Sequence, residues 1–194
     1  MLLLMLISCE EVKEEQSGAE IYAQYCGICH GENGEGYSAP AANALANPEF
    51  LAAATDEFLV IATKDGRPTT KMSPWGDSYG GPLNDEQVTL VVDYIRQWET
   101  LPAADVHEME IIGDINNGTL LYAEYCSSCH GQTGEGTDIA LSLNNPVFLQ
   151  TASDGFIWHA LQYGRSNTIM SSYAETLTEQ EIYDIVSLIR SWEG

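Results

Sequence analysis

Basic side chains are scarce in this sequence of 194 residues. Seven Lys and Arg stand against 29 Asp and Glu, which gives a formal net charge of −22 at pH 7. Proteins that bind nucleic acid neutralise its phosphates with clustered Lys and Arg, so this composition argues against nucleic acid as a partner. Such acidity suggests a solvated periplasmic or extracellular surface, and a protein partner that is basic or apolar where the two touch.

Long apolar runs are lacking too, because no stretch approaches the ~18 consecutive apolar residues that a membrane-spanning helix needs. The first nine residues, MLLLMLISC, form a short apolar run that ends at Cys9. This run resembles a bacterial lipoprotein signal, in which such a cysteine receives the lipid. An ordinary cleaved signal with a chance cysteine is the alternative. The resemblance predicts a lipid anchor at Cys9, in the periplasm or on the outer face of the cytoplasmic membrane.

Cysteine is also infrequent, with five in the chain. Four of them, Cys26, Cys29, Cys126 and Cys129, fall in two copies of one phrase, and the fifth occupies the predicted lipidation position. An odd number of thiols in an exported protein needs an explanation. This distribution supplies one without any disulfide.

The two copies of the phrase belong to a duplication of the chain. YCGICHGENGEG begins at Tyr25 and YCSSCHGQTGEG at Tyr125, and the similarity continues to the pair LNDEQVTLVVDYIRQWE and LTEQEIYDIVSLIRSWE. Such self-similarity at a long period indicates repeated structural units. We therefore predict a signal (1–9), an acidic tether (10–17), a first domain (18–100), a linker (101–117) and a second domain (118–194).

Helical patterns dominate both units. The last segment of each carries apolar residues at helical spacing after a capping residue, as at Asn84 and Thr178. Shorter helices are expected after Thr55 and Ser153, and no alternating run is long enough for a sheet. The sequence therefore predicts an all-α fold of two small tandem domains. Units of about 80 residues are small for a self-sufficient core, so a bound cofactor could complete each one.

The repeated C-x-x-C-H phrase is the attachment signature of c-type haem. Cysteines three apart share one face of a helix, so both thiols can bond the porphyrin while His30 or His130 points at the iron. A zinc ribbon would need its two cysteine pairs closer together, and a redox C-x-x-C pair does not need the histidine. We predict two covalently bound haem c groups, at Cys26 and Cys29 and at Cys126 and Cys129.

A second iron ligand is predicted from the scarcity of methionine. Beyond the signal there are three, and Met72 and Met170 occupy equivalent positions, 42 residues after His30 and 40 after His130. Neither lies in a segment with helical periodicity, which favours thioether ligation over core packing. Met109 has no counterpart and is expected to pack.

On these motifs the chain resembles a dihaem class I cytochrome c, two fused monohaem domains, over nearly all of residues 18–194. The resemblance implies that the first and last helices of each unit cross, which brings Tyr22 near Trp98 and Tyr122 near Trp192. It also implies that a proline carbonyl accepts the ring hydrogen of the haem histidine. Pro40 occupies that place, and the second unit has no such proline.

The function expected from these features is single-electron transfer between respiratory or photosynthetic redox partners, with both axial positions of the iron filled. A lipid tether would hold the protein at the membrane, where it could be a subunit of a larger oxidoreductase complex. A dihaem peroxidase-like enzyme and a haem-based sensor with one labile ligand are the alternatives.

Overall fold

The computed structural model describes residues 16–193. The predicted signal with Cys9 lies outside the described residues, as does the predicted tether up to residue 15.

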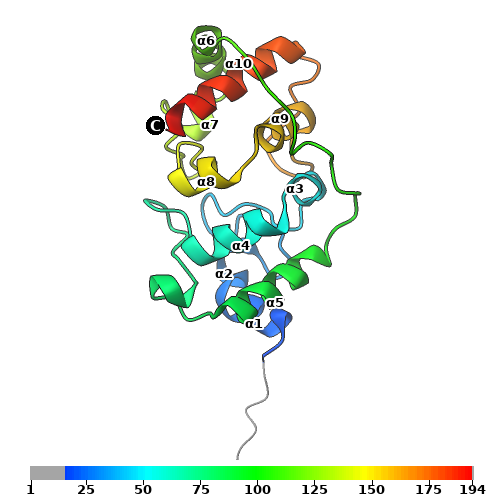
Figure 1. Ribbon diagram of the computed structural model, residues 1–194, viewed down its shortest axis with the longest axis vertical. Helices are drawn as coiled ribbons and strands as arrows, with labels where there is room; N and C mark the ends of the chain where they lie inside the picture. Colours follow the sequence, from blue (N-terminus) through cyan, green and yellow to red (C-terminus); the bar gives the residue numbers. More distant parts are fainter. Residues whose placement is uncertain (1–15, 194) are drawn as a thin grey trace, which may run out of the picture.

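The chain forms two helical units joined by one extended segment (Figure 1). The first unit contains α1 (Gly18–Tyr25), α2 (Gly27–His30), α3 (Pro48–Ala53), α4 (Asp56–Asp65), η1 (Asp77–Tyr79) and α5 (Asp85–Arg96). The second contains α6 (Ile115–Tyr125), α7 (Ser127–His130), α8 (Pro146–Thr151), α9 (Asp154–Tyr163), α10 (Glu179–Arg190) and η2 (Ser191–Glu193). Within residues 16–193 the β pairing amounts to one isolated bridge, between Gly76 and Leu83. The all-α prediction is confirmed. In the same range, no helix has both the length and the apolar character needed to cross a membrane.

The predicted helix starts are confirmed by their caps. Thr55 and Ser153 accept backbone N–H bonds at the starts of α4 and α9. Asn84 and Thr178 begin α5 and α10 with reciprocal capping boxes. Each cap satisfies N–H groups that a helix leaves unpaired, so these boundaries are fixed locally.

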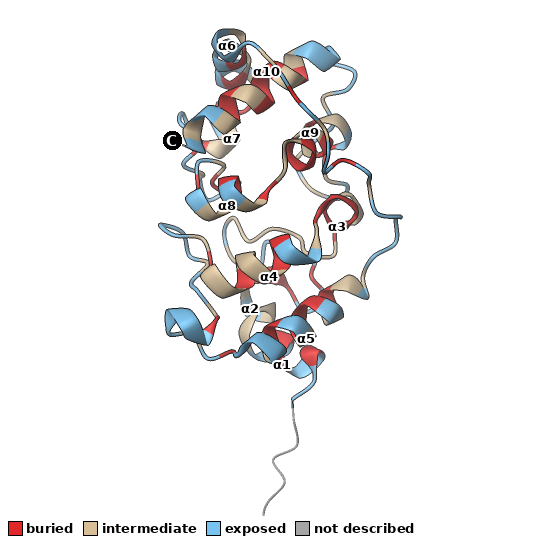
Figure 2. Cartoon of the chain, viewed as in Figure 1, coloured by how far each residue is buried: buried red, intermediate tan, exposed pale blue. Residues whose placement is uncertain are grey.

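Each unit is built on the crossing of its first and last long helices. Gly18 packs against the α5 backbone so closely that a Cβ there would lie 2.0 Å from the Leu90 carbonyl oxygen. The rings of Tyr22 and Trp98 meet edge to face with centroids 5.1 Å apart, and those of Tyr122 and Trp192 do the same at 5.1 Å. The predicted tyrosine–tryptophan contacts are therefore confirmed. The buried residues follow the inner faces of these helices (Figure 2).

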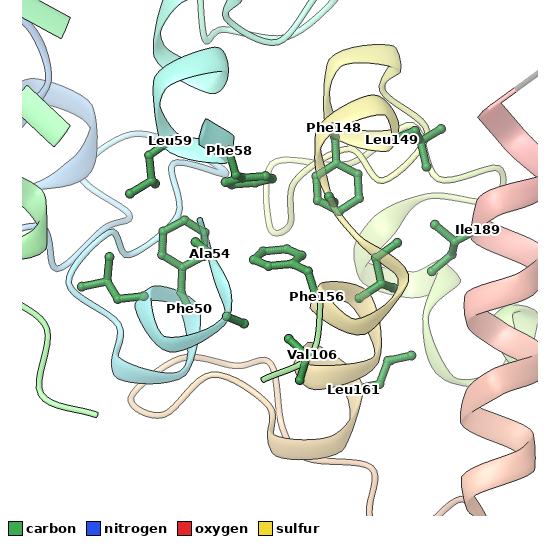
Figure 3. Close-up of a cluster of buried hydrophobic side chains, with 14 of the residues drawn as sticks. Phe50, Ala54, Phe58, Leu59, Val106, Phe148, Leu149, Phe156, Leu161 and Ile189 are labelled. Atoms are coloured by element: carbon green, nitrogen blue, oxygen red, sulfur yellow. The ribbon is translucent and has the colours of Figure 1, made fainter. Parts of the chain in front are cut away.

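The two units meet through the four phenylalanines of the chain: Phe50, Phe58, Phe148 and Phe156. The rings of Phe58 and Phe156 stack at the centre with centroids 4.9 Å apart, and the other two lie on either side (Figure 3). Helix α3 contacts α9, and its equivalent α8 contacts α4. The interface therefore relates the two units by an approximate twofold axis.

The connecting segment is packed along both units. The Ala104 N–H donates to the Ala52 carbonyl oxygen at 2.7 Å, and Val106 is buried against α9. Met109 is partly buried against the core, in keeping with its expected packing role. Helix α6 begins at Ile115, inside the segment expected to be linker, so it is longer at its start than α1.

Candidate functional site

The cysteine pair of each unit lies on a single helical turn. After α1 ends, the Cys26 carbonyl oxygen accepts the N–H groups of Cys29 (3.1 Å) and His30 (2.9 Å). The second unit repeats these bonds at Cys126. This turn brings the thiols of each pair to one face, and all four are free. That is the arrangement required of two attachment points on one ligand.

Burial changes the acidity of the first thiol in each pair. Desolvation, and then the neighbouring thiol, raises the pKa of Cys26 to about 11 and that of Cys126 to about 12. A thiol that stays protonated at neutral pH is a poor nucleophile for disulfide exchange, which needs the thiolate. Cys26 and Cys126 are therefore poor candidates for the attacking cysteine of a redox dithiol.

The glycine-rich turn is folded back on the histidine in both units. Gly31 has φ +85° and Gly131 has φ +84°, a region that favours glycine. The hydroxyl of Tyr22 donates to the Gly31 carbonyl oxygen at 2.9 Å, and that of Tyr122 donates to the Gly131 carbonyl oxygen at 2.9 Å. The first helix thereby anchors the turn.

Each histidine ring is oriented by a backbone carbonyl. His30 Nδ1 lies 2.9 Å from the Asn43 carbonyl oxygen, and His130 Nδ1 lies 3.0 Å from that of Leu141. The prediction that the Pro40 carbonyl accepts this hydrogen bond was wrong, because the carbonyl that meets the ring belongs to Asn43, three residues further along the chain. The second unit needs no proline for the same contact.

This orientation is the test of whether the residues fit a haem iron. When Nδ1 donates to the carbonyl, Nε2 keeps its lone pair for a metal. Burial also lowers the pKa of both imidazoles, which favours the neutral form that ligates. The free thiols and the oriented neutral imidazole together fit haem c in each unit.

The two methionines lie in loops of the same design. The Arg67 N–H donates to the Met72 carbonyl oxygen at 2.7 Å, and the Arg165 N–H donates to the Met170 carbonyl oxygen at 2.7 Å. A threonine hydroxyl two residues before each methionine accepts its N–H at 3.1 Å. Both methionines are half-buried. Their role as iron ligands stays a prediction.

Within residues 16–193 no group of three or more His, Cys, Asp or Glu side chains could hold a metal ion. Figure 1 places α2 and α7, which carry the two cysteine pairs, in different units. The pairs therefore do not form one zinc site.

The sequence analysis missed the arginines, although they carry a clear signal. The chain has four, and they form two equivalent pairs, Arg67 with Arg165 and Arg96 with Arg190. The Arg96 guanidinium pairs with Asp56 at 2.6 Å and donates to carbonyl oxygens of Leu51 and Ala54 at the end of α3. Arg190 makes the equivalent contacts at the end of α8. Arg67 and Arg165 form no salt bridge within the described residues.

Both units of the chain match the same known protein family. The family described as "Cytochrome C oxidase, cbb3-type, subunit III" matches residues 13–95 and 113–189. The cbb3-type cytochrome c oxidase subunit CcoP of Rhodobacter capsulatus is 25% identical over 193 residues, covering 92% of this chain and 62% of its own. Subunit FixP of Bradyrhizobium diazoefficiens is 22% identical, covering 91% of this chain and 60% of its own. The chain thus spans about 60% of the length of these relatives.

A solved structure shows the same fold over both units. A chain of the Kuenenia stuttgartiensis reducing HAO-like protein complex aligns with a TM-score of 0.54 and 21% identity. The alignment covers 92% of this chain and 96% of that one. The paired arrangement of the two units therefore has a counterpart of nearly equal length.

Proposed function

The chain belongs to the family of subunit III of cbb3-type cytochrome c oxidases, and from that membership we propose that it transfers single electrons between redox partners as a subunit of an oxidoreductase complex. It is a dihaem class I cytochrome c, with one haem c in each unit. The observation that carries the proposal is that both units repeat the same frame of thiols, oriented histidine and methionine loop.

Each residue has a defined part in this proposal. Haem c supplies a one-electron Fe(III)/Fe(II) couple when it is bound. Cys26 and Cys29 attach it in the first unit, and the Asn43 carbonyl holds the His30 ring in position to ligate. Met72 would supply the second protein ligand to the iron.

The second unit repeats these roles with Cys126, Cys129, His130 and Met170. A thioether ligand favours a higher reduction potential than a second histidine would. With both a histidine and a methionine bound, each iron would have no position left for a substrate, so we propose a carrier and not an enzyme. A dihaem peroxidase-like enzyme and a haem-based sensor are the competing candidates, because each needs one open or labile site.

The proposal includes a place at the membrane. A lipid on Cys9 and an acidic tether (10–17) would hold domains 18–100 and 118–194, joined by linker 101–117, at the periplasmic surface. The strong negative charge suits redox partners with a basic or apolar docking surface. Replacing Cys9 with Ala should release the protein from the membrane fraction.

Carbon monoxide binding tests whether the irons are closed. We expect the visible spectrum of the reduced, haem-loaded protein to stay unchanged under carbon monoxide. The variants Met72→Ala and Met170→Ala serve as controls, and each should bind about one carbon monoxide per chain because one axial position is opened. Stoichiometric binding by the unaltered protein would contradict the carrier function and favour the enzyme or sensor.

A further inference from the structure

Arg67 and Arg165 lie where the two units meet. The Arg67 guanidinium carbon sits 5.2 Å from the ring centroid of Phe58 in its own unit and 5.9 Å from that of Phe148 in the other. The Arg165 guanidinium carbon lies 5.4 Å from the Phe156 centroid and 5.9 Å from the Phe50 centroid. The four rings are those of Figure 3. Each arginine therefore contacts both units.

Their donors are poorly satisfied within the described part of the chain. Arg67 Nη1 is shielded from solvent and has no hydrogen-bond partner among residues 16–193. Arg165 Nη1 donates at 3.3 Å to the carbonyl oxygen of the adjacent Gly164. Burial lowers the pKa of each guanidinium to about 10. Ring faces attract a cation but do not accept its five N–H groups as oxygen atoms do, so each site is suited to an anion.

No carboxylate in residues 16–193 forms a salt bridge with either arginine, although Asp65 lies near Arg67 and Glu49 near Arg165. Arg96 and Arg190, the other arginine pair, each form a salt bridge to an aspartate at 2.6 and 2.5 Å. Arg67 and Arg165 form none in that range. The anion is therefore best sought outside the polypeptide, and it must be present twice.

Haem supplies such an anion in each unit, because every haem carries two propionate carboxylates. Arg67 lies five residues before Met72, and its backbone N–H donates to the Met72 carbonyl oxygen. The backbone N–H of Arg165 makes the same hydrogen bond to Met170, which is also five residues further along. The loop that carries the predicted iron ligand therefore also carries the unpaired guanidinium. A planar guanidinium and a carboxylate match in a bidentate pair.

We infer that Arg67 and Arg165 each bind a propionate of the haem in their own unit, at the interface between the two units. The inference rests on haem occupancy of both units, which the proposed function shares. It makes the interface part of the cofactor site, because the same guanidinium contacts a phenylalanine of the neighbouring unit. Pairing with the cation also keeps the propionate ionised.

The test is a spectroelectrochemical titration of the haem-loaded protein with the variants Arg67→Gln, Arg67→Lys and Arg165→Gln. Loss of the cation from a site of low dielectric should favour the ferric form of one haem. We expect a shift of about tenfold in its reduction equilibrium, or about 59 mV for a one-electron couple. The propionate should then titrate near neutral pH, so that the potential of this haem depends on pH between 5 and 8. Arg67→Lys should restore most of the shift, and Arg165→Gln should move the other haem.

Arg96→Gln is the matched control, because this arginine is paired with Asp56 and with backbone carbonyls. It should lower stability and leave both potentials unchanged. If Arg67→Gln does not fold, the test uses Arg67→Lys and the propionate bending bands of its resonance Raman spectrum. These bands should shift, because a lysine cannot form the bidentate pair. Two haems per chain with unchanged potentials, pH dependence and bands would overturn the inference and leave the proposed function standing. Fewer than two haems per chain would overturn both.

Discussion

A side chain at position 18 should destabilise the first unit. The Cβ of Gly18→Ala would lie 2.0 Å from the Leu90 carbonyl oxygen and 2.7 Å from its carbon. Atoms do not approach so closely, so α1 and α5 must move apart by about 1 Å. Ile21 and Tyr22, which are 0% and 1% exposed, lie next to this contact and would lose packing.

The cost follows from those two side chains. Full burial of each is worth about 1.5–3 kcal/mol. A gap of 0.5–1 Å forfeits about a quarter to a half of the contact energy, which gives about 1–3 kcal/mol for the pair. The better helix propensity of alanine offsets at most about 1 kcal/mol, and less at the first residue of a helix. We expect a net loss of about 1–2 kcal/mol in the free energy of unfolding.

Urea unfolding of the haem-loaded protein, followed by far-UV circular dichroism, measures this loss. With an m-value of about 2 kcal/mol/M, the midpoint for the first unit should fall by about 0.5–1 M. Gly118→Ala should act in the same way on the second unit, where the Cβ would lie 2.1 Å from the Asp184 carbonyl oxygen. Gly27→Ala is the control, because its nearest contacts are at 3.7 Å and the equivalent residue is already Ser127. Equal midpoints for Gly18→Ala and Gly27→Ala would refute the packing argument.

Two further predictions concern stability. Thr69 has φ +67°, which is costly for a β-branched residue, whereas the equivalent residue is Asn167. Thr69→Asn should therefore raise the free energy of unfolding by about 0.5–1 kcal/mol, measured as a higher urea midpoint, and an unchanged midpoint would count against strain at this site. Burial, and then the nearby Arg165, lowers the pKa of His159 to about 4, so an unfolded chain takes up this proton first as the pH falls. The stability is therefore complete above about pH 6.5 and falls by up to about 3 kcal/mol toward pH 4. His159→Ile, which copies the equivalent Ile61, should remove this part of a stability–pH profile, and an unaltered slope would contradict the assignment.

The features that could be predicted from the sequence are those fixed within a few residues. Thr55, Ser153, Asn84 and Thr178 cap the helices that they were expected to begin, because a cap bonds the N–H groups of its own first turn. The cysteine–histidine phrase likewise defines its geometry within one turn, so the candidate site was evident from its spacing. The crossing of the outer helices came from the family resemblance and not from the pattern itself.

The acceptor for His30 shows what the sequence could not supply. A backbone carbonyl is present at every residue, so no side chain marks Asn43 as the one that meets the ring. The packing of the two units was hidden for another reason. Interface contacts join residues about 100 positions apart, and only the repetition of Phe and of the Gly-Arg pair hinted at them. The length of α6 was missed as well, since its first turn reads as a polar connector.

The interface keeps its twofold relation in the backbone but not in its charge. Asn47 donates to the Ser166 carbonyl oxygen at 2.9 Å, and the equivalent Asn145 donates to the Pro68 carbonyl oxygen at 2.8 Å. Glu49 accepts the N–H and hydroxyl of Ser166, at 3.0 and 2.9 Å.

At the equivalent place across the twofold axis, both partners of the Glu49–Ser166 contact are replaced. Pro68 has no N–H to donate, and Val147, which corresponds to Glu49, has no carboxylate to accept it. Each change alone would leave a polar group with a poorer partner, so the two belong together. Each arginine therefore has one carboxylate near it, but from a different source: Asp65 of its own unit for Arg67, and Glu49 of the other unit for Arg165. Because a nearby anion weakens the field of a cation, Arg67 is screened from within its own unit and Arg165 from across the interface. The two units therefore share their residue frame but differ in which unit supplies the carboxylate next to the interface arginine, Asp65 or Glu49.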